Sequence, residues 1–375
     1  MTEVTAICRF CHATCGLVAT LEDGQITKLI GDLANPMYTG YSCIKGRNYH
    51  EFHSSPDRVL KPLRRNASGD FERVTSGVAL AEIASKTQSI LDRYGPRSVA
   101  MYGGTFSHFC PAGVMLREAF MDAIGSPMRF SNATIDQPGK PISMALHGKW
   151  GAGPQDFAEA DVCLLVGANP LVSMWGGIPS FNPARRLHEA RKRGLKLIVI
   201  DPRRTDLVRS PHIEAQHHLA LRPGTNVAVL TAMAHTIVTE GLVDEAFVRE
   251  RCDWSEFKDW ADFVSLERNS PETLEPVTQV PAADLRAAAR LYATGGNGAI
   301  YYGLGVTEHS QGSSTVMAIA NLAMATGNIG HRGVGVNPLR GQNNVQGACD
   351  MGSFPHELPG YRHISDAATR REFEA

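Results

Sequence analysis

Residues 161–170 read Asp161-Val-Cys-Leu-Leu-Val-Gly-Ala-Asn-Pro170, a short apolar run that ends in a Gly-Ala-Asn-Pro turn. A second apolar run, Lys196-Leu-Ile-Val-Ile200, ends in Asp201-Pro-Arg-Arg204. Short continuous apolar runs are typical of parallel strands that are covered on both faces. Between the two runs, residues 182–192 have the spacing of an amphipathic helix. This order predicts a right-handed strand–helix–strand unit of a parallel sheet.

The alternation of strands and helices continues on both sides of this unit. Further strands are expected over residues 97–102, 216–221 and 299–302, and further helices over 115–123, 226–239, from 280 onwards and over 313–326. The expected fold class is therefore α/β. We predict an N-terminal domain with a small sheet, followed by doubly wound parallel-sheet (Rossmann-like) domains.

Four of the expected strands end in loops that suit a nucleotide-containing ligand. The loops are Gly167–Pro170, Asp201–Arg204, Arg222–Asn226 and Gly303–Thr307. In doubly wound sheets ligands collect at the carboxyl ends of the strands, where glycines admit a ligand and Arg pairs with phosphate. One such loop alone is ordinary turn chemistry, whereas four together indicate a site. No G-x-G-x-x-G or Walker lysine loop is present, which weighs against NAD and ATP.

The first 43 residues carry Cys8, Cys11, Cys15 and Cys43 in the pattern C-x2-C-x3-C-x27-C. Without a secretory leader, this spacing indicates a thiolate metal site rather than disulfides. Zinc sites more often use two C-x2-4-C pairs, so the pattern favours a [4Fe–4S] cluster over zinc or unligated thiols. Residues 17–30 alternate about Asp23-Gly24, which predicts a hairpin that returns the chain to Cys43.

Lys45 follows the fourth cysteine by two residues. Its two interpretations are a solvated surface charge and a cation between the cluster and a second redox group. The more distant Cys110, Cys163 and Cys252 lie singly, as buried and inert thiols do.

The composition excludes several classes of protein. The 375 residues are 43% hydrophobic and 20% charged, as in globular proteins, and their length indicates two or three domains. Thirty-seven basic and 38 acidic residues give a net charge of -1, so no overall field attracts nucleic acid or an anionic membrane. No run of eighteen apolar residues is present. We expect a cytoplasmic protein without membrane insertion.

The sixteen residues Asn337-Pro-Leu-Arg-Gly-Gln-Asn-Asn-Val-Gln-Gly-Ala-Cys-Asp-Met-Gly352 carry a specific resemblance. Together with the cysteine pattern, they resemble the dimethyl sulfoxide reductase superfamily of molybdenum and tungsten bis-pterin enzymes, and most of all the catalytic subunits of formate dehydrogenases. The resemblance runs from Cys8 to Tyr361. It implies a [4Fe–4S] cluster on the four cysteines and a molybdopterin guanine dinucleotide that carries molybdenum or tungsten.

The resemblance also implies roles for single residues. Lys45 lies between cluster and pterin, and Arg340 lies beside the metal, where its guanidinium suits a planar carboxylate. The implied contacts to molybdopterin guanine dinucleotide are Lys45, Asn169, Asp201, Arg203, Gly224, Asn226, Gly305 and Gln342.

The chain departs from the family pattern in two places. Formate dehydrogenases carry a Cys or selenocysteine metal ligand followed by His, whereas residues 131–143 here contain neither. Asp136 is the candidate protein ligand in that region, and an ordinary loop Asp is the alternative. The family's chains also continue further, so we expect a C-terminally truncated chain: a gene fragment, a split subunit or a shortened protein. The expected domains are 1–60, 61–134 with 345–375 (incomplete), and 135–344.

Three functions remain open from the sequence. The first is a formate-dehydrogenase-like oxidoreductase that passes electrons between a small anionic substrate and the cluster, with an electron-transfer partner subunit. The second is a nitrate-reductase-like oxo-transfer enzyme, favoured if Asp136 ligates the metal. The third is a cluster-only electron-transfer or scaffold subunit that has lost the metal. If the cysteines bind zinc instead, the chain is a zinc-stabilised nucleotide-binding enzyme.

Overall fold

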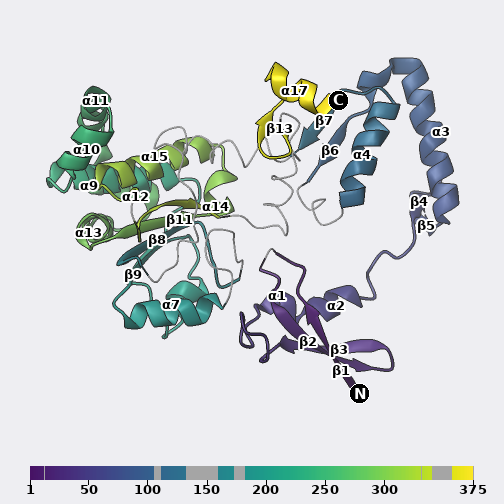
Figure 1. Cartoon of the computed structure of the whole chain (residues 1–375), viewed down its shortest axis with the longest axis horizontal. Coiled ribbons are helices and arrows are strands. Elements are labelled where there is room, and N and C mark those ends of the chain that lie inside the picture. Colours follow the sequence, from purple (N-terminus) through teal and green to yellow (C-terminus); the bar gives the residue numbers. More distant parts are fainter. Residues whose placement is uncertain are drawn as a thin grey trace.

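The computed structural model describes residues 1–11, 13–104, 111–131, 159–172, 182–330, 332–339 and 357–374. The chain begins with a three-stranded antiparallel sheet of β1 (Thr2–Ile7), β2 (Gly16–Glu22) and β3 (Gln25–Gly31). Asp23 and Gly24 both have positive φ, as a two-residue hairpin turn requires, which confirms the predicted hairpin. Two short helices follow, α1 (Ile44–Arg47) and α2 (Tyr49–His53). We call residues 1–55 the cysteine module (purple in Figure 1).

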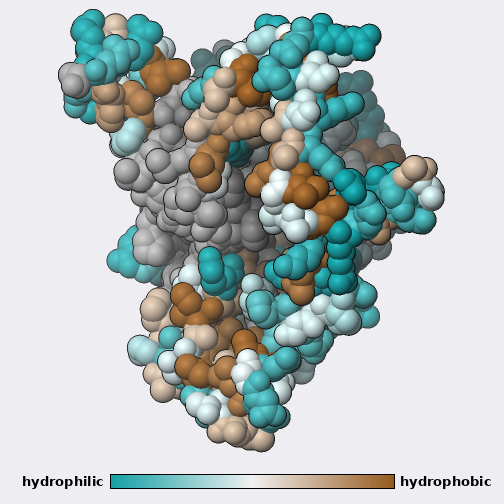
Figure 2. Space-filling view, turned by 90° about the vertical axis from the view of Figure 1, so that its right-hand side faces the viewer, coloured by the Kyte–Doolittle hydropathy of each residue, from teal (hydrophilic) through white to brown (hydrophobic). Residues whose placement is uncertain are grey.

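The next segment contains two small sheets and two helices. β4 (Leu63–Arg65) pairs with β5 (Phe71–Arg73) in antiparallel, and β6 (Met101–Gly103) pairs with β7 (Arg129–Ser131) in parallel. The helices are α3 (Ser76–Tyr94), η1 (Pro96–Ser98) and α4 (Pro111–Ala123). Of the strand predicted over 97–102, only the end forms, because Pro96 begins a 3-10 turn. α3 buries none of its residues, and Figure 2 shows apolar surface residues scattered among hydrophilic ones on this side of the molecule.

A five-stranded parallel sheet forms the largest domain (Figure 1). Its order is β10-β9-β8-β11-β12, so the first strand along the chain lies in the middle and the strand order reverses beside it. This confirms the predicted α/β, doubly wound fold. The strands are β8 (Val162–Val166), β9 (Lys196–Ile200), β10 (His217–Leu219), β11 (Gly298–Tyr302) and β12 (Gly335–Pro338).

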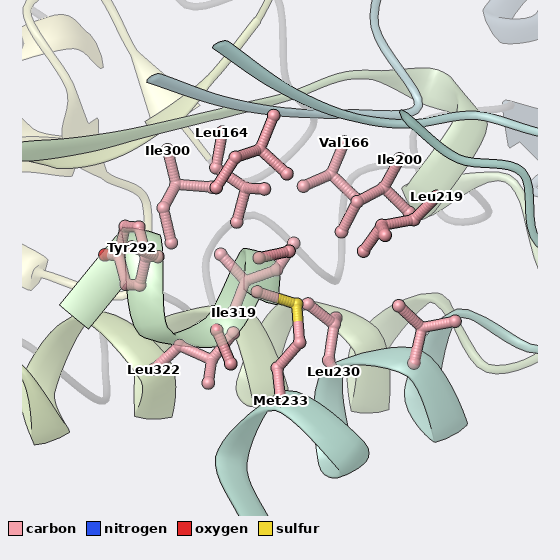
Figure 3. Close-up of a cluster of buried hydrophobic side chains, with 14 of the residues drawn as sticks. Leu164, Val166, Ile200, Leu219, Leu230, Met233, Tyr292, Ile300, Ile319 and Leu322 are labelled. Carbon is pink, nitrogen blue, oxygen red and sulfur yellow. The ribbon is translucent and has the colours of Figure 1, made fainter. Parts of the chain in front are cut away.

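Alternate residues of β8 enter two separate cores. Leu164 and Val166 pack with residues of α9 (Asn226–Thr239), α13 (Ala282–Thr294) and α15 (Gly312–Ala325), and Figure 3 shows this core between strands and helices. Cys163 and Leu165 face the opposite core, which contains residues of α7 (Pro183–Lys192). All four of these β8 side chains are fully buried. The sheet is therefore covered on both faces, which explains the unbroken apolar runs in its strands.

The remaining elements are short or lie outside the sheet. α10 to α12 were not predicted, because no strand directly precedes them: α11 and α12 pack on α9, and α10 packs on α15 and α11. Within the described residues no helix has the length and apolarity to cross a membrane. The elements not yet named are α8 (Asp206–Arg209), α10 (Glu245–Arg251), α11 (Trp254–Ser265), η3 (Glu267–Asn269), α12 (Pro271–Thr278), α14 (Leu304–Thr307), β13 (Glu357–Leu358), β14 (Arg362–His363) and α17 (Ala367–Glu374).

The backbones that leave β8 and β11 approach each other closely at two glycines. A Cβ on Gly305 would lie 2.8 Å from the Cα of Gly167, and a Cβ on Gly167 would lie 2.7 Å from the carbonyl carbon of Gly305. The Gly305 N–H donates to the Gly167 carbonyl at 3.2 Å. Gly167 also has a φ of 55°, which few other residues adopt. The loops after the two neighbouring strands can therefore approach this closely only if positions 167 and 305 are both glycine.

We predict that Gly305→Ala lowers the free energy of unfolding by about 1–3 kcal/mol, because the new methyl group overlaps the Gly167 backbone. Urea unfolding followed by circular dichroism measures the change. Gly77→Ala is the matched control, since a Cβ there meets nothing within 4 Å and α3 gains a better helix former. Equal stability of Gly305→Ala and Gly77→Ala would contradict the close approach.

Candidate functional site

A cavity of about 330 Å³ opens at the carboxyl ends of the strands in the large sheet. It lies beside β8 and β11, where the strand order reverses, and this is the place where doubly wound sheets bind ligands. The loops after β8, β9, β10 and β11 all contribute to its wall. The lining residues are Gly167, Ala168, Asn169, Val172, Ile200, Asp201, Pro202, Arg203, Leu221, Pro223, Gly224, Asn226, Leu304, Gly305 and His309.

The cavity brings together the predicted cofactor contacts that the structure describes, apart from Lys45. These residues come from four different strand ends and lie far apart in the sequence. The shared residues are Asn169, Asp201, Arg203, Gly224, Asn226 and Gly305. Their roles as cofactor contacts stay a prediction, but their convergence on one cavity supports it.

The polar groups of the cavity are held by short local hydrogen bonds. Asn169 Oδ1 accepts from the Leu171 N–H at 3.1 Å, so the side chain is fixed in a turn. Asp201 Oδ1 accepts from the backbone N–H of Arg203 at 2.8 Å. The Arg203 guanidinium is largely exposed and lies 3.8 Å from the carboxylate. A carboxylate and a guanidinium side by side can bind the N–H edge of a base and a phosphate respectively.

His309 is a lining residue that sequence reasoning missed. It is exposed and lies just beyond α14, two residues past the predicted Gly303–Thr307 loop. Its position in the sequence could have indicated it, because the chain segment after β11 that lines the cavity extends beyond the predicted loop. Val172 and Leu221 were also missed, and together with Pro223 of the predicted Arg222–Asn226 loop they give the cavity an apolar side.

The four predicted ligand cysteines lie near one another in the cysteine module, since Cys8, Cys11 and Cys43 all act on the pKa of Cys15. Cys8, Cys11 and Cys15 are buried and Cys43 is half-buried. The Cys8 N–H donates to the Cys15 carbonyl at 2.9 Å, which closes the loop that carries the first three thiols. Among the described residues, no three His, Cys, Asp or Glu side chains are close enough to hold one metal ion. The preference for a [4Fe–4S] cluster over a zinc ion rests on the C-x2-C-x3-C-x27-C spacing in the sequence.

The environment of these thiols favours a bound positive group. Burial, and then the neighbouring Cys11 and Cys8, raise the pKa of Cys15 to about 12. Burial also raises the pKa of Cys8, while the Lys45 ammonium opposes that rise. Cysteine thiols bind a metal only after they lose their protons, so the iron of a cluster here must supply the positive charge that stabilises the thiolates. Lys45 therefore lies near the thiols, while its position relative to the pterin stays a prediction.

Glycine permits the close packing around the thiols. Gly46 is buried in α1, and a Cβ there would lie 3.2 Å from Cys8 Sγ. Tyr38 is 2% exposed, and its hydroxyl donates to the Ala13 carbonyl between the second and third cysteines. The segment between β3 and α1 thereby anchors the backbone between Cys11 and Cys15.

Several predicted residues lie outside the described residues: Asp136, Arg340 and Gln342, with Cys110 and Cys349. Of the remaining cysteines, Cys163 is fully buried as predicted, and burial raises its pKa far above the usual range. Cys252 is only half-buried, so the prediction of a buried thiol is wrong for it, because it lies at the exposed end of α10.

Two known protein families match the chain, one over the cysteine module and the other over most of the remaining residues. Residues 1–55 match the molybdopterin oxidoreductase Fe4S4 domain, and residues 58–373 match the molybdopterin oxidoreductase domain. The chain belongs to the molybdopterin oxidoreductase family. This confirms the predicted resemblance and the two cofactor classes, a [4Fe–4S] cluster and a molybdopterin that carries molybdenum or tungsten. The predicted domain boundaries stay a prediction.

Several relatives that this chain resembles in sequence are formate dehydrogenases. The chain is 35% identical to the F420-dependent formate dehydrogenase 2 subunit alpha of Methanococcus maripaludis and 33% identical to formate dehydrogenase H of Escherichia coli. These matches cover 99% and 100% of this chain but 53% and 51% of the relatives. The chain therefore spans about half of their length.

A solved structure with the same fold is named for a different reaction. Acetylene hydratase from Pelobacter acetylenicus matches 87% of this chain and 43% of its own, with a TM-score of 0.63 and 27% sequence identity. The shared fold alone thus does not determine the reaction.

We predict that Cys43→Ser abolishes iron binding by the molybdopterin oxidoreductase, because a serine hydroxyl is a poor ligand for a soft iron–sulfur cluster. Iron analysis and visible absorbance of anaerobically purified protein measure the loss. Cys252→Ser is the control, since this thiol lies at the end of α10, outside the cysteine module, and we expect it to retain the iron of the unmodified chain. Retention of full iron by Cys43→Ser, or one zinc and no iron in the unmodified chain, would contradict the predicted ligand set.

Proposed function

We propose that this chain is the catalytic core of a formate dehydrogenase, in which electrons pass between formate and the [4Fe–4S] cluster. The observation that carries the proposal is the identity of 33–35% to formate dehydrogenase chains over nearly all of this chain. When bound, the molybdopterin metal accepts the two electrons that formate gives up as it becomes carbon dioxide and a proton. The protein's own residues bind and orient the reactants.

Two residues carry the roles nearest to the chemistry in this proposal, and a third separates it from the oxo-transfer alternative. Arg340 holds the substrate carboxylate through its planar guanidinium. Asp136 stands in the region where the family has a thiolate, and a bond from this carboxylate to the metal belongs to the oxo-transfer alternative. Lys45 supports electron transfer, since its ammonium is close enough to the Cys8 thiol to oppose the rise that burial causes in that thiol's pKa. An electron-transfer partner subunit completes the proposed enzyme.

The cavity accommodates the guanosine end of the cofactor in this proposal. The Asp201 carboxylate accepts hydrogen bonds from the N–H groups of guanine, and Arg203 pairs with phosphate. Gly224 has a φ of 90° and nothing within 4 Å of a Cβ position, so it leaves that side of the cavity open. Adenine lacks the matching pair of donors, so the carboxylate selects guanine.

We predict that Asp201→Asn weakens binding of GMP by about 10- to 100-fold, the equivalent of one hydrogen bond to a charged group. Calorimetric titration of the cofactor-free chain with GMP, and with AMP for comparison, measures the effect. Asp206→Asn is the matched control, since that carboxylate pairs with Arg209 and does not line the cavity. Equal affinity for GMP and AMP in the unmodified chain would contradict guanine recognition.

We predict that the anaerobically purified protein reduces viologen dye with formate, and that Arg340→Lys lowers kcat/KM by about 10- to 100-fold through loss of a charged hydrogen bond. Arg332→Lys is the control, because its exposed side chain pairs with Glu159. Oxidation of reduced viologen by nitrate, without formate activity, would favour the oxo-transfer alternative. Iron without molybdenum or tungsten would favour the cluster-only subunit. Either result contradicts the proposal.

A further inference from the structure

Two side chains join the cysteine module to the wall of the cofactor cavity. The first is Tyr41, which precedes Cys43 by two residues. Its hydroxyl donates to the carbonyl of Leu171 at 2.5 Å, across 130 positions of sequence. Leu171 follows the cavity residue Asn169 by two positions. One hydrogen bond thus connects the backbone next to the fourth thiol with the backbone next to the cavity.

The second side chain is Asn182, which lies directly before α7. Its Nδ2 donates to the Tyr38 carbonyl at 3.0 Å and to Thr39 Oγ1 at 3.1 Å. Its Oδ1 accepts from the N–H of Arg185 at 3.1 Å and so caps the helix. Asn182 adopts a left-handed conformation with φ of 41°, which Asn tolerates better than most residues. The same side chain therefore begins α7 and binds the module.

Local hydrogen bonds hold both partners of these contacts in place. On the module side, Asn35 Oδ1 accepts from the N–H groups of Met37 and Tyr38, and the Tyr41 N–H donates to the Tyr38 carbonyl at 2.9 Å. On the cavity side, the Leu171 N–H donates to the side chain of Asn169 at 3.1 Å. A displacement of the module would therefore be transmitted to the cavity wall.

We propose that Tyr41 and Asn182 form a latch that fixes the cysteine module against the loop after β8, and that Tyr41 is a positioning residue that sets the spacing between the cluster and the molybdopterin. This inference rests on the proposed function for its redox role, since only two exchanging redox groups need a fixed spacing. Electron transfer slows steeply with distance, so a loosened latch slows the exchange without removing either cofactor.

The first test is hydrogen–deuterium exchange of the purified chain, which needs no turnover. Tyr41→Phe keeps the ring and removes the donor, and Asn182→Asp keeps the capping oxygen and removes the donor to the module. We expect exchange in residues 38–42 and 167–172 to rise about three- to tenfold in each variant, the equivalent of one hydrogen bond. The strands β9 and β11 should exchange as in the unmodified chain.

Tyr38→Phe is the matched control for this test. It also removes a buried hydroxyl that donates to a backbone carbonyl, but its acceptor, Ala13, lies inside the module. We expect it to raise exchange near residue 13 and to leave residues 167–172 unchanged. The same exchange in residues 167–172 for Tyr41→Phe and Tyr38→Phe would overturn the latch.

The second test uses holoenzyme with iron and molybdenum or tungsten contents equal to those of the unmodified protein. After a short pulse of photoreductant, electron paramagnetic resonance follows how fast electrons redistribute between the cluster and the metal. We expect Tyr41→Phe to slow this redistribution at least threefold, while direct reduction of the cluster by dithionite is unchanged. An unchanged rate would overturn the positioning role. Because the pulse requires no substrate, a failure of formate oxidation is distinguishable from a failure of the latch.

Discussion

The close approach of the Gly167 and Gly305 backbones is the constraint on which the cofactor site depends. It brings the loops after β8 and β11 into contact at the position where the strand order reverses. The cavity lies directly beside this contact, and the loops after β9 and β10 complete its wall. A side chain at either glycine would separate the loops, and the polar groups of Asn169 and Asp201 would no longer face one ligand.

The cysteine module and the sheet domain are stabilised in different ways. The sheet buries apolar residues on both faces and needs no metal for its core. The module is small, and its own buried cluster consists mainly of the cysteines with Ala13, Leu17 and Tyr38. Burial raises the pKa values of Cys8 and Cys15, so their thiolates need the positive charge of bound iron. Binding of the iron–sulfur cluster therefore also stabilises the module. The contacts of Tyr41 and Asn182 join these two parts.

Much of this arrangement could be predicted from the sequence, because its signals are local. Apolar runs identified β8 and β9, Asp23-Gly24 identified the hairpin, and the cysteine spacing identified the module. The contact of Tyr41 with Leu171 could not be predicted, since a tyrosine hydroxyl carries no signal of an acceptor 130 positions away. The same holds for His309, and for α10 to α12, whose packing on α9 and α15 depends on tertiary contacts. The half-exposed Cys252 was misjudged because a single thiol in the sequence does not reveal its exposure.

The central claim is that one chain holds an iron–sulfur cluster and a guanine-tailed molybdopterin at the two sites described. Quantitative elemental analysis of the anaerobically purified protein, with guanine nucleotide released by acid from the same sample, tests it most directly. The account predicts iron together with molybdenum or tungsten, and guanine in proportion to that metal. Zinc in place of iron, or iron without guanine and without molybdenum or tungsten, would contradict it.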